Sequence, residues 1–406
     1  MSQNIVAIFF DLGDTIMDEA TEVKDAQGTT QSAELIEGMA DALHWLHAQH
    51  YRLALVADTR PGTPVNVLQQ HGLLDLFEVL SISEEVGVEK PHPGLFLHAL
   101  QGMHIPEQEY PQVLMVGNNL ERDILGANRL GLRSIFFHTN ERRRSIVKSL
   151  DEAPRHTVTT AQELLDLVQA LSMEIPGDQI PGGLGSSQDI AVAALFAPVI
   201  HFDEAEPFFP LAAGYTIFHT EEQSPSFPRR IARGWRPDWS LAIEYAIWWD
   251  WDIGHLYELE HVWVYLDEAH QPVWVEASSH GVYASMVLEV GTLPLEDGHP
   301  VVYSQPGKHA FSPTPHWFRI FRDMVYAETS AYAGEGGVLV KQMYAGQIEK
   351  TPEADARVAA WLRKKAFQPT MKFNRLFHFT PEMLVPWPVL DAWIPQRVNW
   401  WIGQLG

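Results

Sequence analysis

An unbroken apolar run, residues 5–10, leads directly into an acidic residue, Asp11. A short run of this kind is typical of a strand that is buried on both faces of a parallel sheet. Asp11 should then lie at the carboxyl end of the strand, the edge where ligands bind in open α/β sheets. A carboxylate there can act as a nucleophile or hold a metal ion. The structural alternative is that Asp11 and Thr15 only build a turn.

Apolar strands and helical segments alternate through the first 173 residues. Short apolar runs predict further strands over 52–57, 76–81, 113–117 and 133–137. Helical spacing of apolar residues predicts helices over 36–49, 65–71, 94–101, 124–130 and 160–173. This order predicts a doubly wound α/β domain. Parallel strands share one carboxyl edge, so the sheet should gather the polar residues that follow its strands: Asp11, Asp58, Thr59, Lys90, Asn118 and Asp123.

This set of polar residues suits the hydrolysis of a phosphate monoester. One carboxylate can attack phosphorus, and a lysine can stabilise the negative charge of the nucleophile and the phosphate. Mg²⁺ takes hard oxygen ligands and neutralises phosphate oxygens. Lys90 precedes Pro-His-Pro, so its alternative role is that of a solvated loop lysine.

Residues 4–170 resemble the haloacid dehalogenase (HAD) superfamily, through the motif at Asp11, the lysine at Lys90 and the Gly-Asn…Asp motif at 117–123. The resemblance implies a Mg²⁺-dependent phosphohydrolase that acts through an aspartyl-phosphate on a phosphorylated small molecule or a large phospho-substrate. Asp11 would be the nucleophile and a metal ligand. The remaining roles implied are metal binding by the Gly13 carbonyl, Asn118 and Asp123, catalysis by Lys90, and substrate binding by Asp58 and Thr59.

Three positions depart from the family pattern. The general acid two residues after the nucleophile is replaced by Gly13, and Asp14 is the alternative catalytic candidate. The second motif ends in Ala57 where Ser or Thr is usual, and Asn118 replaces an acid. The connections 15–52 and 59–90 hold no long insertion, which predicts a domain without a cap. The alternative function is therefore a catalytically weak HAD scaffold that carries a binding domain.

A chain of 406 residues suggests two domains. Its formal charge of −24 argues against nucleic-acid binding, and the absence of cysteine excludes disulfides and thiolate metal sites. No apolar run is long enough to span a bilayer, and no basic segment precedes the first strand, so we expect a cytoplasmic protein without a secretory signal. The oligomeric state stays open.

Glycine, proline and serine dominate residues 174–189, which predicts a flexible linker between domains at 1–173 and 190–406. Thirteen of the 14 tryptophans lie beyond residue 190. Alternating polarity over 261–266, 272–276 and 301–303 predicts strands of an antiparallel β-sandwich, and Thr351 and Pro352 open a helix that runs to about residue 365. We expect the tryptophans of the C-terminal tail to be buried.

Four segments of the second half, at 196–210, 258–262, 278–281 and 299–309, resemble the Vps62 family, which is distantly related to NPP1-like proteins. In those relatives, acids and a histidine hold a divalent cation. The resemblance implies a second divalent cation site, for which the candidates are Asp252, His255, Glu258, Glu260, His280 and His309. The alternative is that these side chains only form hydrogen bonds inside the sandwich.

Overall fold

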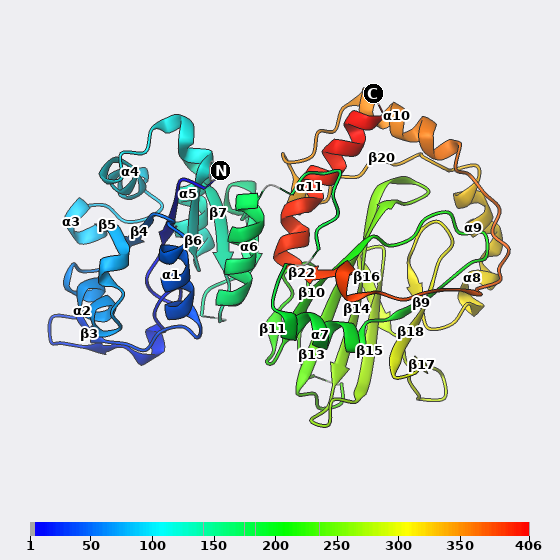
Figure 1. Ribbon diagram of the computed structural model, residues 1–406, viewed down its shortest axis with the longest axis horizontal. Coiled ribbons are helices and arrows are strands. Elements are labelled where there is room, and N and C mark those ends of the chain that lie inside the picture. The colour runs from blue at the N-terminus through cyan, green and yellow to red at the C-terminus, as the bar shows by residue number, and fades with distance from the viewer. Residues whose placement is uncertain (1–4, 141, 174, 183, 235, 406) are drawn as a thin grey trace. The chain divides into compact units, whose positions relative to one another are not determined.

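The computed structural model describes residues 5–140, 142–173, 175–182, 184–234, 236–405 of the chain. The chain divides into two compact units, residues 1–174 and 175–406 (Figure 1). Residue 174, where the predicted linker begins, lies outside the described residues. Residue 183 lies outside them as well. Described residues of that stretch make hydrogen bonds within the second unit, because the Trp393 Nε1 donates to the Gln179 carbonyl and the Arg397 Nη1 donates to the Gly177 carbonyl, each at 2.7 Å.

The first unit is an α/β domain with a six-stranded parallel sheet of order β5-β4-β1-β6-β7-β8. Its strands are β1 (Ala7–Phe10), β4 (Leu53–Ala57), β5 (Phe77–Ile82), β6 (Val113–Gly117), β7 (Arg133–Phe137) and β8 (His156–Val158). Its helices are α1 (Met39–Ala48), α2 (Gly62–Gln70), α3 (Ser83–Val86), α4 (Pro93–Gly102), α5 (Leu125–Arg129) and α6 (Ala161–Met173). The sequence predicts this fold class correctly.

The strand order places the functional edge. From β1 the chain first builds one side of the sheet, with β4 and β5, and then the other side, with β6, β7 and β8. The strand order therefore reverses direction at β1. Ligands of open α/β sheets bind at such a switch point, beyond the carboxyl ends of the strands. The strand residues are buried on both faces: β1, β4 and β6 contain no exposed residue. A small hairpin of β2 (Val23–Lys24) and β3 (Thr30–Ser32) follows the first strand.

The second unit is β-rich. Its larger sheet has the order β16-β15-β14-β13-β10-β22, with β20 also paired to β14, and its smaller sheet has the order β17-β18-β9-β21, with β19 paired to β18. The larger sheet consists of β10 (Ala212–Phe218), β13 (Leu241–Trp251), β14 (His255–Leu266), β15 (Pro272–Ser279), β16 (Val282–Ser285), β20 (Gly337–Val338) and β22 (Leu384–Pro386). The smaller sheet consists of β9 (Val199–Phe202), β17 (Leu295–Glu296), β18 (His299–Ser304), β19 (Phe311–Ser312) and β21 (Arg375–Phe377). A separate pair is formed by β11 (Glu222–Gln223) and β12 (Arg230–Ile231).

The predicted antiparallel pairing is found from β10 to β16, whereas β9 and β18, β10 and β22, and β14 and β20 pair in parallel. The sheets are therefore mixed. The helices of this unit are α7 (Ser187–Phe196), α8 (His316–Ile320), α9 (Arg322–Thr329), α10 (Pro352–Arg363) and α11 (Trp387–Gln404). The hydroxyl of Thr351 caps α10, as predicted. Trp387 and Trp393 of α11 are buried, which confirms the packing role expected of these two tail residues.

Candidate active site

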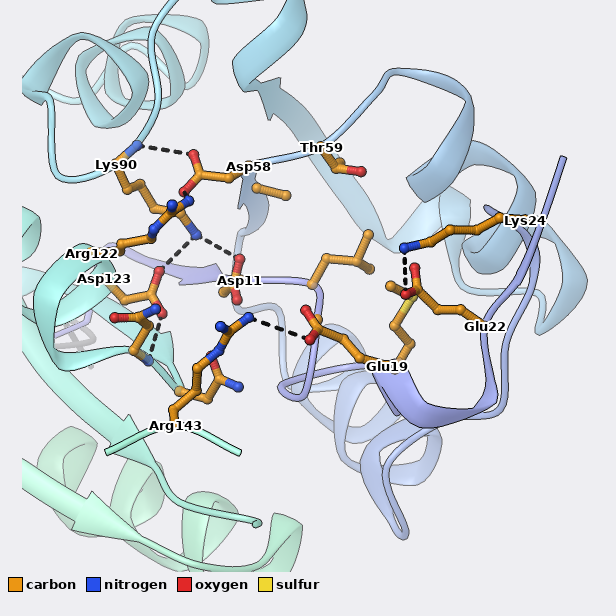
Figure 2. Close-up of a pocket in the computed structure, with 16 residues that line it drawn as sticks. Asp11, Glu19, Glu22, Lys24, Asp58, Thr59, Lys90, Arg122, Asp123 and Arg143 are labelled. Carbon is orange, nitrogen blue, oxygen red and sulfur yellow. Dashed lines mark hydrogen bonds and ion pairs between the residues drawn. The ribbon is translucent and has the colours of Figure 1, made fainter. Parts of the chain in front are cut away.

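Lys90 connects the two acids that follow the central strands. Its Nζ lies 2.5 Å from Asp11 Oδ1 and 2.7 Å from Asp123 Oδ1, and it donates to the Val56 carbonyl at 2.9 Å (Figure 2). The lysine is 4% exposed. Burial alone lowers the pKa of Lys90, but Asp11, Asp123 and Asp58 outweigh it and hold the pKa well above its usual value. Lys90 is therefore a charged ammonium held in place, and the alternative of a solvated loop lysine is excluded.

Asp58 fixes the loop that carries Lys90. Its Oδ1 accepts from the Lys90 backbone N–H at 2.9 Å, and its Oδ2 pairs with Arg122 Nη1 at 3.0 Å. The Asp58 carboxylate thus holds the lysine in position. Asp58 and Thr59 both line the pocket. Asp58 is a positioning residue in this arrangement and does not itself meet Asp11.

Asp123 is fully buried at the start of the helical segment that follows β6. Its Oδ2 accepts from the Asn119 backbone N–H at 2.9 Å. A Cβ on Gly117 would lie 2.4 Å from the Asp123 carboxyl, so only glycine at the end of β6 lets the acid reach the sheet edge. Burial and the nearby Asp11 raise the pKa of Asp123, and Lys90 compensates only in part. The chain here forms a π-helical turn, Leu120–Ile124, ahead of α5, whereas the sequence predicts a helix only from residue 124.

Asp14 does not take part in this site, which corrects its assignment as a catalytic candidate. Its side chain is fully buried and accepts two hydrogen bonds from the Arg142 guanidinium, at 2.9 Å from Nε and 2.6 Å from Nη2. Residue 14 also has a positive φ of 52°. The turn after Gly13 therefore directs the carboxylate away from Asp11, into an ion pair that fastens the first motif to the loop after β7.

A pocket of about 260 Å³ opens at this edge of the sheet (Figure 2). Seven of the eight residues predicted for the first site line it, namely Asp11, Gly13, Asp58, Thr59, Lys90, Asn118 and Asp123. Five charged residues that sequence reasoning did not single out line it as well, namely Glu19, Glu22, Lys24, Arg122 and Arg143. The first three come from the turn and hairpin after β1, and no motif spacing marks them.

Glu19 lies against Gly13. Burial, with Asp14 next, raises the pKa of Glu19, and Asp11 adds to the rise while Arg143 opposes it. The Arg143 Nη2 is 3.4 Å from Glu19 Oε2, with both side chains partly exposed. The pocket thus presents a carboxyl group that is separate from the lysine-bridged pair.

A parallel sheet with a lysine-bridged pair of acids at its switch point defines an α/β domain with a candidate site at the carboxyl edge. A family model for haloacid dehalogenase-like hydrolases matches residues 13–137. The N-terminal part of the chain is therefore a HAD superfamily hydrolase domain. The first motif residue, Asp11, lies two residues ahead of the matched range.

Curated relatives match about a quarter of the chain. The glyceraldehyde 3-phosphate phosphatase of Methanopyrus kandleri is 32% identical over 103 residues, which are 25% of this chain and 43% of that protein. The pyrimidine 5'-nucleotidase YjjG of Escherichia coli is 39% identical over 101 residues, 25% of this chain and 42% of that protein. The chain thus spans about two fifths of the length of these relatives. Among solved structures, the magnesium-bound HAD-hydrolase YfnB of Bacillus subtilis is 18% identical, with a TM-score of 0.35, over 40% of this chain and 98% of that one.

Among its described residues, the second unit contains two overlapping groups of side chains whose metal-ligating atoms lie within 4.8 Å of one another. One consists of Asp252, His255 and Glu258, and the other of Glu258, Glu260 and His280. Glu258 and Glu260 share a face of β14, as the two-residue spacing predicts. His309 belongs to neither group, which corrects its assignment: its ring stacks on Trp249 at 4.7 Å between centroids, and its Nε2 lies 3.5 Å from Glu206 Oε1.

Two lysines share the carboxylates of this second cluster. Lys308 Nζ lies 2.6 Å from Asp252 Oδ1, and Lys341 Nζ lies 3.5 Å from Glu258 Oε1. The other oxygen, Asp252 Oδ2, is buried and has no hydrogen-bond partner among the described residues. Burial and the neighbouring Glu258 raise the pKa of Glu260. The cluster therefore has more carboxylate oxygens than its lysines satisfy.

Proposed function

We propose that the first unit is a Mg²⁺-dependent phosphohydrolase in which Asp11 forms an aspartyl-phosphate. The observation that carries the proposal is the buried Lys90 ammonium held between Asp11 and Asp123 at the floor of a polar pocket. The relatives named above act on a triose phosphate and on pyrimidine nucleotides, as their names state. A phosphorylated small molecule is accordingly the substrate class we propose, with a larger phospho-substrate as the alternative.

The chemistry assigned to the chain's own residues has two steps. The Asp11 carboxylate attacks phosphorus, the bond from phosphorus to the leaving oxygen breaks, and the leaving group departs with a proton. Water then attacks the aspartyl-phosphate, which releases inorganic phosphate and restores Asp11. Lys90 forms an ion pair with Asp11 and lies where it can stabilise the phosphoryl oxygens. Asp58 and Arg122 keep the Lys90 loop in place.

The donors at the pocket floor fit Mg²⁺. Asp11 and Asp123 supply carboxylate oxygens, Asn118 supplies an amide oxygen, and Gly13 can supply a backbone carbonyl; all four line the pocket. Burial first and Asp11 second raise the pKa of Asp123, and Lys90 opposes the rise only in part, so a divalent cation would stabilise the ionised carboxylates. When bound, Mg²⁺ would neutralise the phosphate oxygens and lower the barrier to attack by an anionic nucleophile.

The test is phosphate release from a panel of phosphomonoesters by the full chain in the presence of Mg²⁺. We expect Asp11→Asn to abolish turnover and Asp41→Asn, an exposed substitution of the same kind on α1, to leave it unchanged. Equal rates for wild type and Asp11→Asn would contradict the proposal. That result would favour the alternative function, a catalytically weak HAD scaffold that carries a binding domain.

The second unit supports a second proposed function, binding of a divalent cation by a Vps62-like domain. The buried and unpartnered Asp252 Oδ2 beside His255 and Glu258 favours it. Calorimetric titration of the full chain with Ca²⁺, Mg²⁺ and Zn²⁺ should show a binding event that is lost in Glu258→Gln and kept in Glu268→Gln, which alters an exposed loop residue. Identical titrations for wild type and Glu258→Gln would exclude this site.

A further inference from the structure

The Glu19 carboxyl occupies the space that a side chain at residue 13 would fill. A Cβ added to Gly13 would lie 2.2 Å from Glu19 Oε1 and 2.9 Å from its Cδ. The backbone of Gly13 is outside the positive-φ region that favours glycine, so its conformation does not require glycine. The space beside its Cα is taken by the end of the Glu19 side chain. The Glu19 carboxyl thus lies where the side chain of a residue two positions after Asp11 would lie, although Glu19 itself is eight positions after Asp11 in the sequence.

The other carboxyls that line the pocket are already committed to partners. Asp11 and Asp123 share Lys90, and Asp58 is bound to the Lys90 backbone and to Arg122. Glu22 accepts from the Thr30 hydroxyl at 2.6 Å and pairs with Lys24 at 2.8 Å.

Glu19 differs from these. In the described part of the chain its carboxyl contacts one cation, Arg143, at 3.4 Å, and 35% of its side chain is exposed. Figure 2 shows Glu19 and Asp11 facing the same pocket from different elements.

We propose that Glu19 is the group that protonates the leaving oxygen, in place of a residue at position 13. In the first step the electron pair of the bond from phosphorus to oxygen goes to the leaving oxygen, which takes a proton from the Glu19 carboxyl and departs as an alcohol. In the second step the ionised Glu19 takes a proton from the water that attacks the aspartyl-phosphate, so the enzyme ends in its starting state. This inference rests on the proposed phosphohydrolase function.

The test compares two substrates that differ in how much their leaving group needs a proton. 4-Nitrophenolate leaves readily as an anion, whereas an alkoxide such as that of glycerol 3-phosphate does not. With the full chain and Mg²⁺, Glu19→Gln should lower kcat/KM for the alkyl phosphate about 10²–10⁴-fold and for 4-nitrophenyl phosphate by less than about threefold. Glu22→Gln, which alters another carboxyl of the same pocket, should change both substrates by the same factor.

A relocated carboxyl provides a second measurement. Glu19→Ala clears the space beside residue 13, and the double substitution Gly13→Asp with Glu19→Ala places a new carboxyl there. We expect the double variant to regain part of the alkyl phosphate activity that Glu19→Ala loses. A loss that is equal for both substrates, with no recovery in the double variant, would assign Glu19 a structural role and overturn the inference.

The two proposals fail in different ways. If Asp11→Asn hydrolyses 4-nitrophenyl phosphate as fast as wild type, the phosphohydrolase function falls and the role of Glu19 falls with it. If hydrolysis depends on Asp11 but Glu19→Gln affects both leaving groups alike, only the role of Glu19 is refuted.

Discussion

Glu276, on β15 of the second unit, is buried between two arginines. Its Oε2 accepts from Arg229 Nη2 at 2.6 Å and from the Tyr265 hydroxyl at 3.1 Å, and its Oε1 accepts from Arg236 Nη2 at 2.8 Å. The side chains of Arg229 and Glu276 are 2% and 1% exposed. Burial alone would raise the pKa of Glu276, but Arg229 and Arg236 outweigh it and lower the pKa.

Glu276→Gln should destabilise the second unit strongly at neutral pH. The substitution keeps the shape of the side chain but leaves two buried guanidinium groups without their anion, and arginine cannot escape by losing a proton. Removing one partner of a buried ion pair costs about 3–5 kcal/mol. Arg229 stacks on the rings of Trp263 and Tyr283, at 4.3 and 3.8 Å, and these cation–π contacts remain in the variant. We therefore expect the cost to lie below the upper end of that range.

The pH dependence gives the sharper test. Because the folded-state pKa of Glu276 is lowered, its contribution to stability is present above the unfolded pKa of about 4.3 and is lost as pH falls through the folded value. The difference in stability between wild type and Glu276→Gln should therefore shrink below about pH 4. Urea unfolding followed by tryptophan fluorescence reports this unit, because 13 of the 14 tryptophans lie beyond residue 190.

Glu268→Gln is the matched control, since Glu268 is exposed in the loop between β14 and β15, and it should change stability by less than about 0.5 kcal/mol. A cost below about 1 kcal/mol for Glu276→Gln, or a cost that stays constant into acid, would refute the assignment of a buried, ionised carboxylate.

Three further predictions concern the first unit. Gly117→Ala should lower stability by about 1–3 kcal/mol in urea unfolding and reduce turnover, because a Cβ there would lie 2.4 Å from the Asp123 carboxyl. Asp58→Ala should lower kcat about tenfold and Asp58→Asn much less, since only the amide can still accept from the Lys90 backbone N–H; equal losses would count against the positioning role. Asn118→Asp should tighten Mg²⁺ binding about tenfold in a titration of activity against metal, because a charged oxygen replaces a neutral one.

The sequence predicts the sheet of the first unit well because its strands are buried on both faces. The expected strands at 113–117 and 133–137 coincide with β6 and β7, and the strand at 52–57 overlaps β4. β1, β4 and β6 consist of apolar residues and glycine, so a continuous run marks each of these strands and the first polar residue marks its end. For the same reason the sequence alone predicts that Asp11, Asp58 and Asn118 lie at one edge of the sheet.

The predictions for Asp14 and His309 were wrong for a common physical reason. Asp14 follows Gly13 directly, but its own positive φ turns its carboxylate toward Arg142, which is 128 residues away in sequence. His309 falls in a recognisable segment, yet it packs on Trp249 apart from the acids of β14. In both cases a distant partner decides where the side chain points, and the spacing of residues along the chain carries no information on that partner.

The charge arrangement at the pocket floor explains how the departures from the family pattern can be accommodated together. With Asn118 neutral, the charges at the pocket floor are the Asp11 and Asp123 carboxylates and the Lys90 ammonium. A third carboxylate at 118 would add repulsion to Asp123, whose pKa burial and Asp11 already raise. The amide keeps an oxygen donor for a cation without that cost. Glu19 lies at the side of the pocket, where its carboxyl has Arg143 and solvent beside it. That is the setting in which we propose that Glu19 exchanges a proton with the leaving group.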